Sequence, residues 1–399
     1  MADVAIIGAG PAGLFAAEHL ARLGHAVTVY DQMPSPGRKF LLAGRGGLNL
    51  THSEALEPFL ERYGAAADWL APALAQFSPS DLRVWCEGLG QTTFVGSSGR
   101  VFPTAFKAAP LLRAWLRRLD GMGVVFAARH RWQGWSSDGA LCFSRMAGDV
   151  AVHPAATLLA LGGASWPRMG SDGGWLGILR GRGVDVADLR PSNCGVCIEW
   201  SSVFRARHEG APLKRIALSA GGKSVRGEAV VTKAGLEGGA VYALSAALRT
   251  ALDQAGQARL EVDLRPDINE AALALRVDGP RQAVSLSNFL RQQAGLPPVA
   301  IGLVQEALHA GVAPVKLSRL IKGVPLTVSG LQPIARAISS AGGIRRAELN
   351  AALMIQRLPG VFAAGEMLDW EAPTGGYLLQ ACFSTALQAA SGMAQWVNS

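Results

Sequence analysis

Three closely spaced glycines interrupt an apolar run near the start of the chain, in the stretch DVAIIGAGPAGLFAAEHL at residues 3–20. The apolar residues before Gly8 predict a buried strand, and the residues after Gly10 predict an amphipathic helix. A strand that runs directly into a helix turns the free N–H groups of the first helical turn toward the connecting loop, where they favour an anion. The stretch therefore predicts an anion-binding turn built on Gly8, Gly10 and Gly13.

The spacing Gly-x-Gly-x-x-Gly gives each glycine a separate role. Gly8 permits the tight turn, Gly10 lets a diphosphate approach the backbone, and Gly13 lets the helix pack closely on the strand. The next predicted strand, AVTVY, ends at Asp31, whose carboxylate can accept hydrogen bonds from a ribose 2′-hydroxyl. An acid here argues against a 2′-phosphate, so the motif predicts FAD or NAD. The same predicted contact set includes Pro11, Ala12 and Gln32.

A glycine-rich, cationic loop follows, reading GRKFLLAGRGGLNLTH over residues 37–52. Its cations and backbone amides suit an extended, phosphate-bearing ligand. Asn49 and Thr51 lie at an otherwise apolar end, where the polar edge of a bound ring would need partners. The alternative is a surface loop with solvated cations. The predicted cofactor contacts in this loop are Arg38, Lys39, Gly44, Arg45, Gly46, Asn49 and Thr51.

Two later segments are predicted to reach the same ligand. The first is LLALGGASWP, residues 158–167, an apolar strand that ends in paired glycines. The second, residues 360–392, contains a short strand, a glycine turn and a long helix. The amino end of that helix would present partial positive charge, which suits the N1/C2=O edge of a reduced flavin. The predicted contacts in these segments are Gly162, Gly163, Gly365, Glu366, Gly375, Gly376 and Tyr377.

Together these segments resemble the BaiN-like family of FAD-dependent oxidoreductases, which includes aminoacetone oxidases. Members carry GRK…GGGRCNxT and LATGG…YP…TGS motifs, matched here by GRKFLLAGRGGLNLT and LALGGASWPRMGSDGG. The stretch VTKAGLEGGAVYALS matches a further motif loosely, and AGEMLDWEAPTGGYLLQ gives the most specific match. The resemblance spans nearly the whole chain. It implies a noncovalently bound FAD, and transient binding of NAD(P)H at the active-site face is left open. The FAD contacts that it implies are Gly8, Gly10, Gly13, Asp31, Arg38, Lys39, Asn49, Thr51, Gly365, Glu366, Gly375 and Gly376.

Two departures separate this chain from the family pattern. Gly47 and Leu48 stand where members usually carry Arg-Cys, and Lys233 stands where many carry a histidine. Both positions can face the flavin or the substrate. The resemblance therefore does not transfer a member's substrate to this chain.

The predicted cofactor segments lie at both ends of the chain, so the α/β, Rossmann-like FAD-binding domain is predicted to be discontinuous, over residues 1–190 and 335–399. Residues 191–265 are largely strand-like and predict an inserted β-rich, barrel-like substrate domain. Residues 266–334 are punctuated by prolines and predict a small helical module. This plan agrees with the one that the resemblance implies.

Composition and charge restrict the class of protein. The 399 residues are 49% hydrophobic and 17% charged, enough for two or three domains with real cores. The net charge of +8 is dispersed, without a basic tail, which argues against dedicated nucleic-acid binding. No apolar run could span a bilayer and no signal peptide precedes the first strand, so a cytoplasmic location is expected.

The five cysteines do not indicate a metal or redox site. Cys194 and Cys197 have C-x-x-C spacing, but they lie in NCGVCIEW, which predicts a strand. Residues three apart on a strand point to opposite faces, so the two sulfurs would not converge. We therefore predict no metal.

The predicted reaction is hydride transfer at flavin N5 with a small organic substrate, linked to NAD(P)H. No second Gly-x-Gly-x-x-Gly motif is present, so a dedicated nicotinamide domain is not expected. Three alternatives remain open: an amine oxidase that uses O2, an RNA-modifying flavoprotein, and an FAD-binding electron carrier without turnover. No catalytic residue is assigned, and no oligomeric state is predicted. The candidate bases or cations near N5 are Arg45, His52, Lys233, Tyr242, Glu366, Asp369 and Tyr377.

Overall fold

The computed structural model of the chain describes residues 2–43, 46–281, 283–311 and 316–399. The chain divides into two compact units, each with its own hydrophobic core. We call residues 1–190 with 339–399 the first unit and residues 191–338 the second unit. The strands β11 (Val186–Ser192) and β19 (Ser339–Ile344) pair where the chain leaves the first unit and returns to it.

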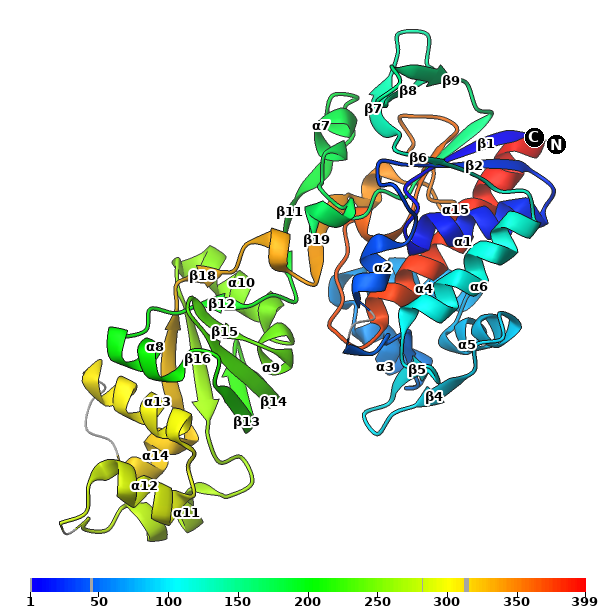
Figure 1. Cartoon of the computed structure of the whole chain (residues 1–399). Coiled ribbons are helices and arrows are strands. Elements are labelled where there is room, and N and C mark those ends of the chain that lie inside the picture. The colour runs from blue at the N-terminus through cyan, green and yellow to red at the C-terminus, as the bar shows by residue number, and fades with distance from the viewer. Residues whose placement is uncertain (1, 44–45, 282, 312–315) are drawn as a thin grey trace. The chain divides into compact units, whose positions relative to one another are not determined.

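A five-stranded parallel sheet forms the centre of the first unit (Figure 1). Its strand order is β20-β10-β1-β2-β6, so the last strand of the chain joins the sheet formed by the first ones. Four of the five residues of β1 are buried, and all of β10 is, as expected for parallel strands covered on both faces. The bounds are β1 (Asp3–Ile7), β2 (Ala26–Asp31), β6 (Val125–Ala128), β10 (Ala156–Leu159) and β20 (Val361–Ala363).

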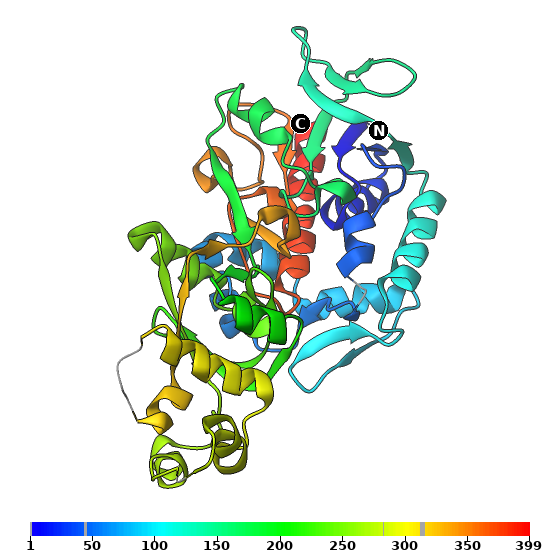
Figure 2. The ribbon, with the colours of Figure 1, turned by 60° about the vertical axis from the view of Figure 1, so that its left-hand side comes forward.

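The helices α1 (Pro11–Arg22) and α15 (Tyr377–Asn398) pack on each other although they lie at opposite ends of the chain. Pro11 occupies the first position of α1, where its missing N–H costs no helical hydrogen bond. The ring of Phe15 meets Phe383 edge-on, with 5.0 Å between centroids. Figure 2 shows α15, in red, among elements of the N-terminal half. Both chain ends therefore build one core.

Smaller elements complete the first unit. One three-stranded sheet has the order β3-β5-β4 and another the order β7-β8-β9. Their bounds and those of the remaining helices are α2 (Arg38–Ala43), β3 (Thr51–His52), α3 (Leu56–Glu61), η2 (Gly64–Ala66), α4 (Ala67–Gln76), α5 (Pro79–Gly88), β4 (Thr93–Val95), β5 (Arg100–Pro103), α6 (Ala108–Gly121), β7 (Arg131–Trp135), β8 (Leu141–Ser144), β9 (Val150–Val152), η3 (Pro167–Met169), α7 (Trp175–Arg180), η5 (Arg346–Glu348) and η6 (Gly365–Met367).

A seven-stranded antiparallel sheet dominates the second unit, with the order β17-β16-β13-β14-β15-β12-β18. Its two outermost strands, β17 and β18, are separated in the chain by Ser329 alone. The sheet must therefore curl until its edges approach, which gives it the predicted barrel-like form. The bounds are β12 (Val196–Cys197), β13 (Pro212–Ala220), β14 (Lys223–Thr232), β15 (Gly235–Glu237), β16 (Ala258–Asp263), β17 (Val324–Val328) and β18 (Gly330–Leu331).

Helices pack on this sheet and share its core. The predicted helical range 266–334 is wrong at its end, because residues 324–331 form β17 and β18. Their sequence, VPLTVSGL, is rich in β-branched residues and extends the sheet. The separation of a helical module from a β-rich domain at residue 266 stays a prediction. The helix bounds are α8 (Ser202–His208), α9 (Gly239–Tyr242), α10 (Ser245–Ala255), α11 (Glu270–Val277), α12 (Leu286–Ala294), α13 (Pro298–His309), α14 (Leu317–Lys322) and η4 (Ile334–Arg336).

The parallel sheet, the antiparallel sheets and their helices confirm the predicted α/β fold class. All five cysteines are free thiols. Within the described ranges, no group of three or more His, Cys, Asp or Glu side chains is arranged to hold a metal ion. No helix among the described residues combines the length and the apolar character needed to cross a bilayer.

Candidate dinucleotide site

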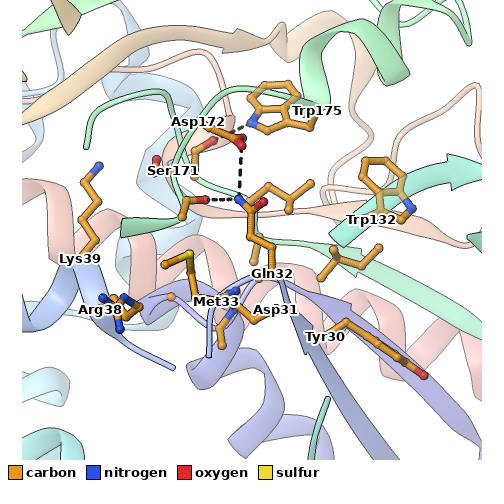
Figure 3. A pocket seen from close by; sticks show the side chains of 18 of the residues that line it. Tyr30, Asp31, Gln32, Met33, Arg38, Lys39, Trp132, Ser171, Asp172 and Trp175 are labelled. Atoms are coloured by element: carbon orange, nitrogen blue, oxygen red, sulfur yellow. Dashed lines mark hydrogen bonds between the residues drawn. The ribbon is translucent and has the colours of Figure 1, made fainter. Parts of the chain in front are cut away.

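A cavity of about 260 Å³ lies in the first unit, where β1, β2 and β10 end at their carboxyl edge (Figure 3). In parallel α/β sheets, this edge is the usual place for a ligand. Segments that are distant in the sequence line it, from the first glycine turn to α15. The predicted contacts that line it are Gly8, Gly10, Pro11, Ala12, Asp31, Gln32, Arg38, Lys39, Gly162 and Glu366.

The three glycines of the first turn meet different surroundings. Gly8 has a φ of +109°, and a Cβ there would lie 2.3 Å from the carbonyl oxygen of Ala160. A Cβ on Gly13 would lie 1.9 Å from the oxygen of Gly8, so helix and turn are in direct contact. A Cβ on Gly10 would meet nothing within 4 Å. Gly8 and Gly13 thus hold the turn closed, while Gly10 leaves its backbone open to the cavity.

Asp31 ties the end of β2 to the glycine turn. Its carboxylate accepts hydrogen bonds from the backbone N–H of Ala9 and of Met33, both at 2.7 Å. Burial raises the pKa of the Asp31 carboxyl above its ordinary value, and the two backbone hydrogen bonds and the Arg38 charge offset part of this rise. The carboxylate therefore both stabilises the turn and faces the cavity.

Lys39 and Glu366 join the two ends of the chain in the wall of the cavity. The Lys39 ammonium lies 2.7 Å from Glu366 Oε2 and donates to Ser165 Oγ at 2.6 Å. The other oxygen of Glu366 accepts from the backbone N–H of Ser340 at 2.8 Å. Because Glu366 is buried, this pairing supplies the partners that its charge requires.

The end of the cationic loop meets the start of α15. Gly376 has a φ of +96°, and a Cβ there would lie 2.5 Å from the Cα of Thr51. Thr51 Oγ1 and Asn49 Oδ1 are buried without a hydrogen-bond partner, as is Arg38 Nε. Buried polar atoms are normally paired, so these atoms fit a ligand that supplies polar groups. The open backbone at Gly10 and these unpaired atoms together fit FAD.

Several predicted contacts do not line the cavity. Gly365, with a φ of +80°, allows a close approach to Ala12, and Gly163 packs on Ser340. Gly44 and Arg45 lie outside the described residues. The other predicted contacts away from the cavity lining are Gly13, Gly46, Asn49, Thr51, Gly375, Gly376 and Tyr377.

The side chain of Tyr377 points into a polar cluster and away from the cavity lining. Its ring stacks on His52 with 5.5 Å between centroids, and its hydroxyl donates to Glu54. Arg62 pairs with Glu54 at 2.8 Å, and Tyr63 donates to the Tyr377 carbonyl at 2.8 Å. Burial and the Glu54 carboxylate raise the pKa of Tyr377 far above its ordinary value. Tyr377 and His52 thus anchor the start of α15, and only backbone groups of Tyr377 stay predicted cofactor contacts.

The remaining candidate bases are dispersed. Lys233 and Tyr242 belong to the second unit, and Lys233 is exposed in the turn after β14. Asp369 pairs with Arg345 at 3.5 Å in the first unit. Burial raises the pKa of the Asp369 carboxyl, and the Arg345 charge opposes that rise. The described residues therefore assign no general base.

Several polar and aromatic groups in the cavity wall were not identified by the sequence analysis. Arg131 and Asp172 form an ion pair at 3.1 Å, and Trp175 donates to the carbonyl of Gly162 at 2.9 Å. Cys382 of α15 also lines the cavity, where burial raises the pKa of its thiol to about 12. Arg131 and Cys382 belong to no local motif. Asp172 lies within LALGGASWPRMGSDGG, but that motif did not single it out as a contact.

A family model of the HI0933-like protein Rossmann domain matches residues 2–392. The chain belongs to this family. This membership confirms the predicted kinship with FAD-dependent oxidoreductases and the Rossmann-like fold.

The HI0933-like chain is similar over its full length to curated proteins. It is 25% identical to the 3-dehydro-bile acid delta(4,6)-reductase of Clostridium scindens, with 99% of this chain and 100% of that protein covered. It is 24% identical to the ribosomal RNA dihydrouridine synthase of Haemophilus influenzae, with 96% of each covered. The protein of that name from Escherichia coli is 23% identical, with the same coverage.

Solved structures share the fold of this HI0933-like chain. The 3-ketosteroid delta1-dehydrogenase of Sterolibacterium denitrificans has a TM-score of 0.55 at 12% identity, with 99% of each chain covered. A flavocytochrome c3 fumarate reductase has a TM-score of 0.54 at 16% identity, with 100% of this chain and 79% of that one covered. With the family match, these findings place the chain among FAD-dependent oxidoreductases and confirm the prediction of an enzyme.

Proposed function

We propose that this chain binds FAD noncovalently and reduces a carbon–carbon double bond conjugated to a carbonyl group, with electrons from NAD(P)H. The observation that carries the proposal is the cavity at the glycine turn, which Lys39 and Glu366 complete from opposite chain ends. FAD, when bound, supplies hydride exchange at its N5 atom.

The first turn of α1 would hold the diphosphate. The backbone at Gly10 is open, and the amino end of α1 carries partial positive charge. Arg38 and Lys39 add cationic charge to the same cavity. The Asp31 carboxylate would accept hydrogen bonds from the ribose hydroxyls.

The flavin end would lie where Thr51 and Gly376 meet. The unpaired oxygens of Asn49 and Thr51 can accept hydrogen bonds from polar ring atoms, and the amino end of α15 favours negative charge on the ring. The predicted contacts at Gly46, Gly365 and Gly375 would keep the backbone near the cofactor. Together these groups would orient the ring and tune its reactivity.

The names of the relatives support the reaction class. A delta(4,6)-reductase, a dihydrouridine synthase and a fumarate reductase each add hydrogen across a carbon–carbon double bond, and a delta1-dehydrogenase removes it. Two of these names, 3-dehydro-bile acid and 3-ketosteroid, also include a ketone. These names support hydrogen transfer to a carbon–carbon double bond, and we propose that a small molecule carries this bond.

An anaerobic two-step reaction tests the proposal. The purified protein should carry yellow FAD that NADH or NADPH bleaches, and a conjugated unsaturated ketone should restore the colour. The matched saturated ketone should leave it bleached. If amines bleach the flavin and only O2 restores it, the protein is an oxidase and the proposal is wrong. A flavin that no reductant bleaches would indicate a carrier without turnover.

A specific charge distribution favours RNA as a second candidate substrate. Residues 191–338 contain 17 Lys and Arg against 11 Asp and Glu, so the second unit carries +6 of the chain's net charge of +8. A polyanion prefers such a surface. In the same two-step reaction, a uridine-containing RNA would restore the colour, and its binding would weaken steeply with added salt. If RNA neither restores the colour nor binds with this salt dependence, RNA is not the substrate.

A further inference from the structure

We propose that Gln32, Arg131 and Asp172 form a clasp that retains the bound cofactor at the Asp31 end of the cavity. The proposal rests on the proposed binding of FAD and adds Arg131 and Asp172 to the residues that hold it. All three side chains line the cavity, and each comes from a different segment of the first unit.

The clasp is a continuous hydrogen-bonded network. Arg131 donates from one nitrogen to Gln32 Oε1 at 2.9 Å and from another to Asp172 Oδ2 at 3.1 Å. The Gln32 amide donates to the carbonyl of Gly170 at 2.9 Å and lies 3.4 Å from Asp172 Oδ2. Figure 3 shows the Gln32 side chain reaching toward Asp172 from the end of β2. Each polar group thus has a partner on another segment.

The segments that the clasp joins surround the place assigned to the ribose. Gln32 directly follows Asp31, and Arg131 begins β7, whose preceding residue His130 donates from its backbone to the Asp31 carbonyl at 2.9 Å. Asp172 lies in the loop between η3 and α7, which Trp175 holds to Gly162. A ligand anchored at Asp31 could leave this end only after the segments separate.

The exposure of the clasp determines what it can do. The side chain of Arg131 is 55% exposed and that of Asp172 is 28% exposed. Exposed ion pairs contribute little to the stability of the fold, because water solvates both charges when they separate. The hydrogen bonds of the clasp can therefore break while the protein stays folded. The clasp is thus expected to change the rate of cofactor release and not the stability of the fold.

Arg131 and Asp172 make different hydrogen bonds, so a substitution of either residue can remove a defined part of the network. Asp172 Oδ1 also accepts from the backbone N–H of Gly174 at 3.0 Å, which shapes the loop. Asp172→Asn keeps an oxygen for that bond and removes the charge. Arg131→Ala removes both bonds of the guanidinium, whereas Arg131→Lys keeps the charge but cannot reach both partners with a planar fork.

The test measures FAD release from the full chain after dilution, followed by flavin fluorescence. We expect Arg131→Ala to release FAD roughly three- to tenfold faster than the unmodified protein, because the two lost hydrogen bonds are partly exposed and water replaces part of each. Asp172→Asn should have a smaller effect in the same direction, and Arg131→Lys should lie between Arg131→Ala and the unmodified protein. The double variant should match Arg131→Ala, because the two residues act through one network.

The control is Arg226→Ala, which breaks an ion pair with Asp267 at 3.1 Å in the second unit, where both side chains are more than 60% exposed. It should release FAD at the unmodified rate. The thermal unfolding temperature of the FAD-free protein should be the same for all variants. Unchanged release from Arg131→Ala, or equal acceleration by Arg226→Ala, would overturn the clasp while leaving FAD binding intact. An unmodified protein that binds no FAD would instead refute the proposed function, and the clasp with it.

Discussion

Lys39 Nζ lies 2.7 Å from Glu366 Oε2, an ion pair between residues 327 positions apart. The side chain of Glu366 is only 8% exposed, so its charge depends on this partner and on the Ser340 N–H. Both residues line the cavity at the end of the parallel sheet. This ion pair therefore joins the two ends of the chain in the wall of the cavity.

Removal of Lys39 alone should destabilise the protein. Lys39→Met leaves the buried Glu366 carboxylate without its cation, and we expect the free energy of unfolding to fall by about 1–3 kcal/mol. The double variant Lys39→Met, Glu366→Gln should recover part of this loss, because no unpaired charge remains. Urea denaturation of the three proteins measures both effects. A double variant less stable than Lys39→Met would contradict the importance of the pair.

Substitutions of Gly10 and Gly13 should separate binding from folding. Gly10→Val places its side chain in the open space beside the turn, so it should abolish FAD binding while the unfolding temperature stays near that of the unmodified FAD-free protein. Gly13→Ala should lower both, because its Cβ would lie 1.9 Å from the Gly8 oxygen. Flavin absorbance and thermal denaturation distinguish these outcomes. Normal FAD content in Gly10→Val would show that the diphosphate lies elsewhere.

Replacement of Asp31 should weaken FAD binding. Asp31→Ala removes the predicted acceptor of the ribose hydroxyls, and we expect a loss of about 1–3 kcal/mol in binding free energy. Titration of the FAD-free protein with FAD, followed by fluorescence quenching, measures the affinity. An unchanged affinity would place the ribose away from Asp31.

The free energy of unfolding should vary with pH because the pKa of Asp31 is raised in the folded protein. Because its pKa is raised on folding, the native state binds the proton more tightly, and this contribution is fully present below the ordinary pKa of an aspartate. It is lost as the pH rises through the raised value. The stability of the FAD-free protein relative to Asp31→Asn should therefore fall across that window, and urea denaturation at several pH values measures it. A relative stability that rises there would contradict the assigned cause.

The Tyr377 cluster should stabilise the start of α15. Tyr377→Phe keeps the ring on His52 but removes the hydrogen bond to Glu54, and we expect a loss of about 1 kcal/mol in the free energy of unfolding. A matched control is Tyr63→Phe, which removes only the bond to the Tyr377 carbonyl. Chemical denaturation measures both. Full stability in Tyr377→Phe would mean that solvent replaces the lost partner.

Much of the binding turn follows from the amino-acid sequence. The strand, the glycine turn, α1 and the acid at the end of β2 lie within about 30 residues, and their roles depend on local steric limits and helix geometry. The structure accordingly finds Gly8 and Gly13 in close contacts and Gly10 open. The cofactor segments at both chain ends likewise predicted one discontinuous, Rossmann-like domain.

Other features depend on contacts between distant segments, which only the tertiary structure decided. No local pattern indicates that Arg131 meets Asp172, that Tyr377 turns toward Glu54, or that β17 and β18 return to the sheet after the helices. The partner of a side chain on a strand or loop depends on which distant segments pack beside it. The local sequence does not contain that information. The sequence alone thus determined the phosphate-binding turn, whose geometry is local, while the fold decided which side chains close around it.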